Sequence, residues 1–373
     1  MKIVDYEVIE INASQLGDWI FVKLITEKGN IGMGEASQSG NDDLLTYYLE
    51  NELLKGIKNF NHVLNTERYL KKFKRGRINQ KIDCFIQYTA ISSIEQAIWD
   101  IKAKSLDISL LELLGGKNKS DIPLYANINR AVLERSPENF AQVAKEAVSL
   151  GYKGVKLAPF DGVKPNQERD KWKKKVEKGF KRISAVHQVI DENCDLMVDC
   201  HGRFTSQDII WLIDKIEKYN IFWLESPVWP NENIEGLRRI RKNSKIRLAG
   251  GERIRRIEDV WPLVSEQLLD VIMPDVKHCG GINNFLKIAA VAEAADISIA
   301  PHNPSGPIST AISANLSSII PNLIYLEYPY GEIDDRNIYT DIKEPIKEGN
   351  YNLDKLKNYG MGMNIISKSW NNC

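Results

Sequence analysis

The sequence lacks the features that mark several other classes of protein. Five cysteines, an odd number, show no metal-ligand spacing, so neither a zinc module nor a disulfide framework is expected. No apolar run reaches the roughly 18 residues of a membrane-spanning helix, and the N-terminus enters a strand pattern without a signal peptide. Lysine plus arginine equals aspartate plus glutamate, at 50 each, so no net charge attracts nucleic acid or an anionic membrane. We expect a cytoplasmic protein with neither of these partners.

The first third of the chain predicts a small α+β domain. Alternating apolar residues predict antiparallel strands at residues 2–11, 19–26 and 31–36, with a hairpin turn between the last two. Residues 43–116 have a helical pattern, clearest at 89–104, where apolar residues recur at helical spacing. We place this α+β domain at residues 1–120 and expect its loop at 12–18 to overhang a site.

From residue 122 the pattern changes to short apolar strands that alternate with amphipathic helices. The helices include residues 137–150, 169–191 and 281–294, and the eight predicted strands are 122–128, 154–158, 196–200, 221–225, 247–251, 271–274, 298–301 and 323–327. Strict alternation predicts a parallel sheet in the α/β class, and eight strands favour closure into a modified (β/α)8 barrel at residues 121–328. An open doubly wound sheet is the alternative, although no glycine-rich loop follows the first strand. Residues 329–373 are expected to form a tail that returns to the first domain.

Acidic residues end three consecutive strands of the predicted barrel. Asp199, Glu225 and Glu252 are separated by 26 and 27 residues, one β/α unit each. The C-terminal ends of the strands meet at one mouth of a barrel, where three carboxylates would repel one another without a cation between them. Oxygen ligands with room for water favour Mg²⁺, with Mn²⁺ as a possible substitute. The alternative is three unrelated exposed acids at the starts of helices.

Other strand ends supply groups that move or hold protons. Asp275 and His302 are again one unit apart, and a carboxylate behind an imidazole is the arrangement of a general base. Taken singly, His302 could instead be a hydrogen-bonded core histidine. His201 shares a strand face with Asp199, while the remaining strand ends contribute Lys156 and Glu327.

This set of residues resembles the enolase superfamily, mandelate-racemase-like subgroup. Residues 93–100 and 114–117 also resemble linking helices of that family. The resemblance implies an α+β capping domain, a (β/α)7β barrel and removal of a proton α to a carboxylate. It also implies that Asp199, Glu225 and Glu252 are Mg²⁺ ligands. Asp275 and His302 would be the basic dyad, and Glu327 an acid that contacts the substrate carboxylate or its enediolate.

Two departures from the racemase pattern favour elimination of water. Racemases of the subgroup carry Lys-x-Lys on the second strand, whereas this chain has Lys156-Leu157-Ala158. On the third strand, Asp199-Cys200-His201 resembles galactonate-type acid-sugar dehydratases rather than the racemase Asp-x-Asn. We therefore predict a hydro-lyase that forms a 2-keto-3-deoxy acid sugar. His302 would be its base, His201 its acid, and Lys156 would neutralise the substrate carboxylate.

Several alternatives remain open from the sequence. The two histidines could exchange roles, or the protein could be a racemase, epimerase or cycloisomerase, or a non-catalytic acid-sugar-binding protein. Lys277, two positions beyond Asp275, is an alternative base. We expect Lys156, Arg203 and Glu327 to contact the substrate, a small sugar acid, with help from loops at 12–19, 38–43, 75–80 and 160–164. A homo-oligomer, from dimer to octamer, is expected from the resemblance.

Overall fold

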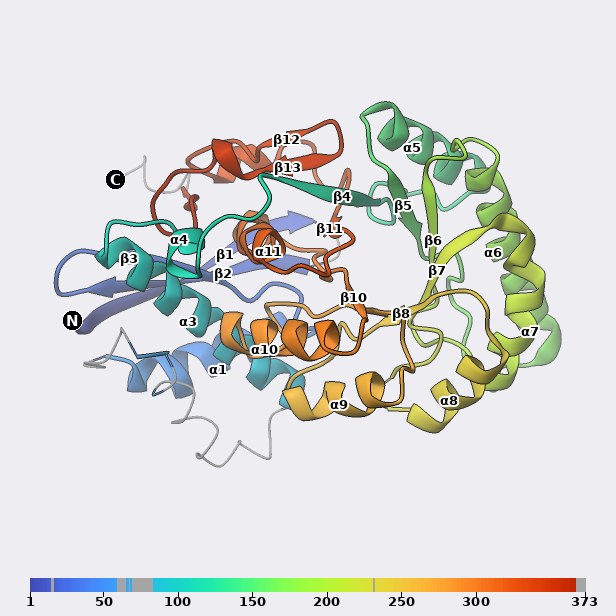
Figure 1. Cartoon of the computed structure of the whole chain (residues 1–373), viewed down its shortest axis with the longest axis horizontal. Coiled ribbons are helices and arrows are strands. Elements are labelled where there is room, and N and C mark those ends of the chain that lie inside the picture. The colour runs from blue at the N-terminus through green and yellow to red at the C-terminus, as the bar shows by residue number, and fades with distance from the viewer. Residues whose placement is uncertain (15–16, 59–64, 67, 69–82, 231, 367–373) are drawn as a thin grey trace.

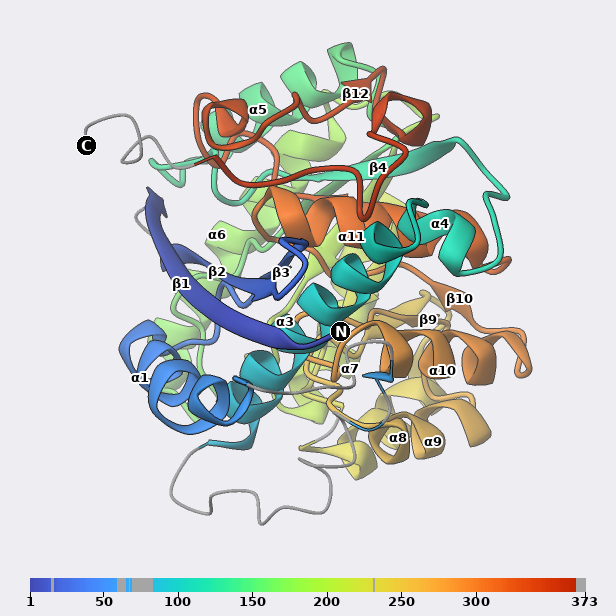
Figure 2. The ribbon, with the colours of Figure 1, turned by 90° about the vertical axis from the view of Figure 1, so that its left-hand side faces the viewer.

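The computed structural model describes residues 1–14, 17–58, 65–66, 68, 83–230 and 232–366. Its N-terminal part is an antiparallel sheet of β1 (Ile3–Ser14), β2 (Gly17–Thr26) and β3 (Ile31–Glu35), in that order. The long helix α3 (Cys84–Ser105) packs against this sheet (Figure 2). The contact is so close that a Cβ atom at Gly34 would overlap the Ser93 carbonyl, which explains why glycine is required in β3.

In the described residues, the helices of this part agree with the helical pattern predicted at 43–116, of which positions 59–64, 67 and 69–82 lie outside the described residues. Helix α1 (Asp42–Tyr48) continues into a π-helical turn (Leu49–Leu53) and a 3-10 turn (Leu54–Gly56), and α4 (Leu110–Leu113) follows α3. The predicted loop at 12–18 is wrong for most of its length, because β1 continues to Ser14 and β2 begins at Gly17. Positions 15–16 lie outside the described residues.

All eight predicted barrel strands are present in the described part of the chain. They are β4 (Asp121–Asn127), β5 (Gly154–Leu157), β6 (Asp195–Asp199), β7 (Ile221–Glu225), β8 (Leu248–Gly250), β9 (Val271–Ile272), β10 (Ser298–Ile299) and β11 (Leu326–Tyr328). Neighbouring strands are parallel from β4 to β10, and β11 pairs with β4. A parallel bridge from Ile299 to Leu323 joins β10 to the segment before β11, so the sheet closes into a barrel.

Seven helices connect these strands in the described residues, which confirms the (β/α)7β expectation. They are α5 (Pro137–Ser149), α6 (Arg169–His187), α7 (Ser206–Ile216), α8 (Ile234–Asn243), α9 (Ile257–Ser265), α10 (Ile282–Glu293) and α11 (Pro307–Ile319). Helices α5 to α9 form an arc around the outside of the strands (Figure 1). No helix of the described residues has the length and apolar character needed to cross a membrane.

The barrel interior explains how the site residues reach its mouth. A compact buried cluster includes Tyr125, Met197 and Trp223, with Tyr125 and Trp223 rings edge to face at 5.4 Å between centroids. Alternate residues of a strand share a face, so Asp199 follows Met197 on the inward side and Glu225 follows Trp223. The packed interior therefore aims both carboxylates into the mouth.

The C-terminal segment touches both parts of the molecule. Strands β12 (Ile346–Lys347) and β13 (Asn350–Asn352) form a hairpin, and β13 pairs antiparallel with β4. Further on, the Met361 N–H donates to Asp100 Oδ1 at 2.9 Å, and Lys104 Nζ donates to Asn364 Oδ1 at 2.8 Å. Because Asp100 and Lys104 lie on α3, the segment after β13 reaches the N-terminal part.

Candidate active site

A cavity of about 520 Å³ lies at the C-terminal ends of the barrel strands. Its wall combines barrel residues, among them Lys156, His201 and His302, with Gln38 and Phe85 from the N-terminal part. A loop and the start of α3 from the N-terminal part therefore form part of the cavity wall.

Three carboxylates meet at this mouth. One oxygen each from Asp199, Glu225 and Glu252 lies within 4.8 Å of the others, and Asp199 and Glu225 are paired neighbours on β6 and β7. Burial, together with the charges of nearby acids, raises the pKa of Glu225 to about 8 although Lys156 opposes this. These oxygens have the hard chemistry that Mg²⁺ or Mn²⁺ prefers, and their mutual repulsion would be relieved by a dication. The donor set therefore fits a divalent metal.

Lys156 is a buried cation that contacts this cluster. Its Nζ lies 2.7 Å from Glu225 Oε1, 2.9 Å from Glu327 Oε1 and 3.9 Å from Asp199 Oδ2. Burial lowers the pKa of Lys156, but the surrounding carboxylates raise it well above its ordinary value. Glu327 also accepts from Asn127 Nδ2 at 2.6 Å. Lys156 is thus a permanent positive charge at the floor of the cavity.

His201 is turned back toward Asp199 by an unusual backbone. Its φ of 47° and the 60° of Gly202 lie in the left-handed region, and a Cβ at Gly202 would collide with the ring of Trp229. In this turn His201 Nε2 lies 2.7 Å from Asp199 Oδ2. Burial lowers the pKa of His201, but the negative charge of Asp199 outweighs it and raises this pKa to about 9. The contact with Asp199 therefore favours the protonated form of the His201 ring.

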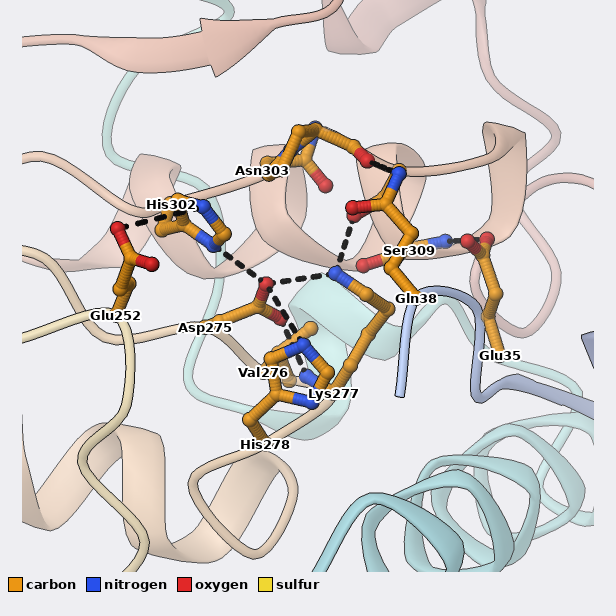
Figure 3. Close-up of polar contacts among 12 residues, drawn as sticks. Glu35, Gln38, Glu252, Asp275, Val276, Lys277, His278, His302, Asn303 and Ser309 are labelled. Atoms are coloured by element: carbon orange, nitrogen blue, oxygen red, sulfur yellow. Dashed lines mark hydrogen bonds and ion pairs between the residues drawn. The ribbon is translucent and has the colours of Figure 1, made fainter. Parts of the chain in front are cut away.

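The predicted dyad is assembled on the other side of the mouth. His302 Nδ1 lies 2.8 Å from Asp275 Oδ2, and Nε2 lies 3.8 Å from Glu252 Oε2 (Figure 3). An ionised Asp275 accepts a hydrogen bond from the Nδ1–H of His302, and this tautomer leaves the lone pair on Nε2. Burial lowers the pKa of His302, and the charges of Glu252, Glu327 and Asp275 reverse this and raise it. The nitrogen that can take a proton thus faces the cavity.

Glu225, Asp275 and Glu327 contact lining residues but are not themselves among the residues that line the cavity. Arg203 also lies outside the cavity wall. Its guanidinium donates to the carbonyl of Phe160 at 3.1 Å, and it is not among the residues that line the cavity. The predicted loop at 160–164 contributes no lining residue either, whereas Gln38, Ser39 and Gly40 of the loop at 38–43 do. The predicted loop at 75–80 lies outside the described residues.

Sequence reasoning missed several residues of the cavity wall. They include Asn127, Arg130, Trp229, Arg253 and His278. Asn127 carried a usable signal, because it is the polar residue that ends β4, and Arg253 directly follows Glu252. Trp229 and His278 lie in loops whose path depends on long-range packing, so no local pattern marked them.

Two family models together match most of the chain. One, described as enolase C-terminal domain-like, covers residues 139–368. The other, the mandelate racemase/muconate lactonizing enzyme N-terminal domain, covers residues 7–115. The chain belongs to the enolase superfamily. A crystal structure of a member of this superfamily from Salmonella Typhimurium matches with a TM-score of 0.89 at 26% identity, over 100% of this chain and 98% of the other.

Curated relatives of this superfamily member carry dehydratase names. D-gluconate dehydratase of Thermoproteus tenax is 32% identical over 75% of this chain, but the match spans only 55% of that protein. D-gluconate/D-galactonate dehydratase of Picrophilus torridus is 28% identical, over 90% of this chain and 83% of the relative. The expected membership and fold are confirmed. The relatives' names agree with the dehydratase pattern in the motifs.

Proposed function

We propose that this protein is a divalent-cation-dependent sugar-acid dehydratase. The observation that carries the proposal is that His201 and His302, from opposite sides of the mouth, line one cavity beside the carboxylate cluster. The racemase alternative lacks its second lysine, because position 158 is a buried alanine. Dehydratase names among the relatives support the same reaction.

The carboxylate cluster would hold the cation and, through it, the acid end of the substrate. We assign Asp199, Glu225 and Glu252 as ligands of Mg²⁺, or of Mn²⁺ in its place. When bound, the cation supplies positive charge against the substrate carboxylate, so that loss of the neighbouring proton becomes easier. Lys156 adds a second positive charge at the same end, and Glu327 orients it through their 2.9 Å contact.

His302 is assigned as the base. Its Nε2 takes the proton from C2, the carbon next to the carboxylate, while Asp275 holds Nδ1 and stabilises the imidazolium that forms. The electron pair of the broken C2–H bond becomes the second bond between C2 and C3.

His201 is assigned as the acid. Hydroxide is a poor leaving group at neutral pH, so the C3 hydroxyl must be protonated as its C–O bond breaks. The His201 imidazolium supplies the proton that makes this hydroxyl leave as water. The resulting enol tautomerises to a 2-keto-3-deoxy acid, and the proton gained by His302 returns to solvent.

The strongest rival is an isomerase, in which the two histidines exchange protons at C2 and no water leaves. A sugar-acid-binding protein without turnover is the second rival.

Cytoplasmic location and a homo-oligomeric state remain predictions. The residue boundaries 120/121 and 328/329 are proposed as the limits of cap, barrel and tail.

A substrate screen separates these functions. Purified protein with Mg²⁺ is incubated with a library of five- and six-carbon sugar acids, including diacids, and 2-keto-3-deoxy products are measured. Dehydration of at least one acid, lost on His302→Asn, is expected. If no acid gives product while one gains solvent deuterium at C2, the protein is an isomerase. Binding without either reaction would identify the non-catalytic alternative.

A further inference from the structure

Lys277 is a fully buried ammonium group that the reaction above does not use. It does not line the cavity, and its exposed fraction is 0%. A base must reach the substrate proton, so the alternative of Lys277 as the base is not supported by this geometry. Burying a charge is costly unless it is paired, and the pairing that Lys277 makes indicates its role.

Lys277 shares one carboxylate with the base. Its Nζ lies 2.6 Å from Asp275 Oδ2, the same oxygen that His302 Nδ1 contacts at 2.8 Å. The backbone N–H of Lys277 donates to the other oxygen, Oδ1, at 2.8 Å. In Figure 3, Asp275 lies between the His302 ring and the Lys277 ammonium. Both oxygens of Asp275 are therefore fixed by Lys277.

The same ammonium also contacts the segment that carries the base. Lys277 Nζ donates to Ser305 Oγ, three residues beyond His302. That segment is held from the cap as well, because Glu35 accepts from the N–H groups of Gly306 at 2.7 Å and Ser309 at 2.8 Å. Lys277 thus links the ends of β9 and β10 at the point where the two members of the dyad meet.

We propose that Lys277 is a positioning residue for proton abstraction. Its ammonium is an internal counter-ion that holds the oxygens of the Asp275 carboxylate in place, so that His302 keeps its Nε2 lone pair directed at the substrate. Lys277 itself touches neither substrate nor cation. The inference rests on the proposed function for its kinetic consequence, but not for its effect on the Asp275–His302 hydrogen bond.

Three variants separate the effect of the Lys277 charge from the effect of its contact with Ser305. Lys277→Met removes the charge with similar length, and Lys277→Gln keeps a donor without the charge. Ser305→Ala is the matched control, because it removes only the contact with the neighbouring segment. Folding is checked for each variant by thermal unfolding. If Lys277→Met does not fold, Lys277→Gln takes its place.

The kinetic readout is the division of the effect between kcat and KM. Loss of a partner that orients a catalytic group typically costs about 10–100-fold in activity. We expect that loss in kcat for both Lys277 variants, with KM changed less than about threefold, and a change of kcat below about threefold for Ser305→Ala. A kcat within about twofold of wild type in a folded Lys277 variant would overturn the proposal.

A spectroscopic readout does not depend on turnover. The downfield proton resonance of His302 Nδ1–H, assigned by its absence in His302→Asn, reports the hydrogen bond to Asp275 directly. It should shift or vanish in Lys277→Met and Lys277→Gln and persist in Ser305→Ala. An unchanged resonance in folded Lys277 variants would contradict the inference. If no sugar acid is dehydrated, the proposed function fails, but the resonance still decides the role of Lys277.

Discussion

The two sides of the barrel mouth solve the same electrostatic problem in different ways. On the dyad side, defined by Asp275 and His302, one buried carboxylate has its own buried ammonium, Lys277, at 2.6 Å. On the metal side, defined by Asp199, Glu225 and Glu252, the first two carboxylates share Lys156 with Glu327, and Glu252 lies 3.8 Å from His302. On the dyad side one buried carboxylate has one buried ammonium, whereas on the metal side several carboxylates share a single ammonium.

The pKa directions express this difference. Asp275 and Glu225 are both fully buried, and burial raises the pKa of each. For Asp275, Lys277 and the two nearby histidines reverse the effect and hold the pKa far below its usual range. For Glu225, Lys156 does not suffice against the neighbouring acids, and the pKa rises to about 8. Equal burial is therefore offset more strongly at Asp275 than at Glu225.

The largest effect is expected from the metal side. Glu225→Gln removes a ligand and should lower kcat/KM at least about 10³-fold, because the cation contributes several kcal/mol to the transition state. Cation titration by calorimetry should show a matching loss of affinity. Activity within about tenfold of wild type at saturating Mg²⁺ would mean that Glu225 is not a ligand.

On the dyad side, Asp275→Asn should lower kcat by about 10²–10⁴-fold, because the base loses its orienting carboxylate. Cation affinity should stay within about threefold of wild type, since Asp275 lies outside the carboxylate cluster. Calorimetry on this variant and Glu225→Gln compares the two sides directly. A parallel loss of cation affinity in Asp275→Asn would show that the sides are not independent.

His201→Asn should separate the two halves of the reaction. Removing the acid should slow dehydration about 10²-fold or more, while the base His302 still exchanges the C2 proton with solvent. Product formation and deuterium incorporation are measured on the same samples. Undiminished dehydration would show that another group is the acid, and loss of both reactions would support swapped histidine roles.

Cation binding should also stabilise the fold. A cation at about 100 times its Kd contributes about 2.7 kcal/mol, which corresponds to a rise in Tm of about 3 °C for a chain of this size. Thermal unfolding with Mg²⁺ and with a chelator measures it. Lys277→Met should keep the whole shift and Glu225→Gln should lose most of it; the reverse pattern would contradict the division of the mouth.

The smallest effect is expected for Arg203→Ala. Because its guanidinium is bonded to the Phe160 carbonyl and not to the cavity wall, kcat/KM should change less than about threefold. Arg253→Ala, at a lining position, should raise KM more. A larger loss of kcat/KM for Arg203→Ala than for Arg253→Ala would show that Arg203 contributes to substrate binding.

The barrel could be predicted because its signals are local. Each strand is a short apolar run, each helix has an amphipathic period, and unit spacing alone placed Asp199, Glu225 and Glu252 together. The direction of the Arg203 side chain could not be predicted by the same rule, because His201 and Gly202 leave the extended conformation. After two left-handed residues, alternation no longer says which way a side chain points.

The contacts that distinguish the two sides were also beyond the sequence. Lys156 and Glu225 are 69 residues apart, and Lys277 and Ser305 are 28 apart. Lys277 could be placed on the face of Asp275, but its complete burial depends on the cap packing over the barrel. Gln38 and Phe85 reach the cavity for the same reason.

The left-handed conformation of His201 limits how this position can diversify. Outside glycine, few residues tolerate a φ near 47°, and histidine, asparagine and aspartate are the enriched ones. The asparagine of the racemase pattern and the histidine found here both belong to that short set. A change between them replaces the chemistry of the side chain without rebuilding the turn. The backbone conformation therefore restricts which residue types can occupy this position, and so which reactions can be supported at this strand end.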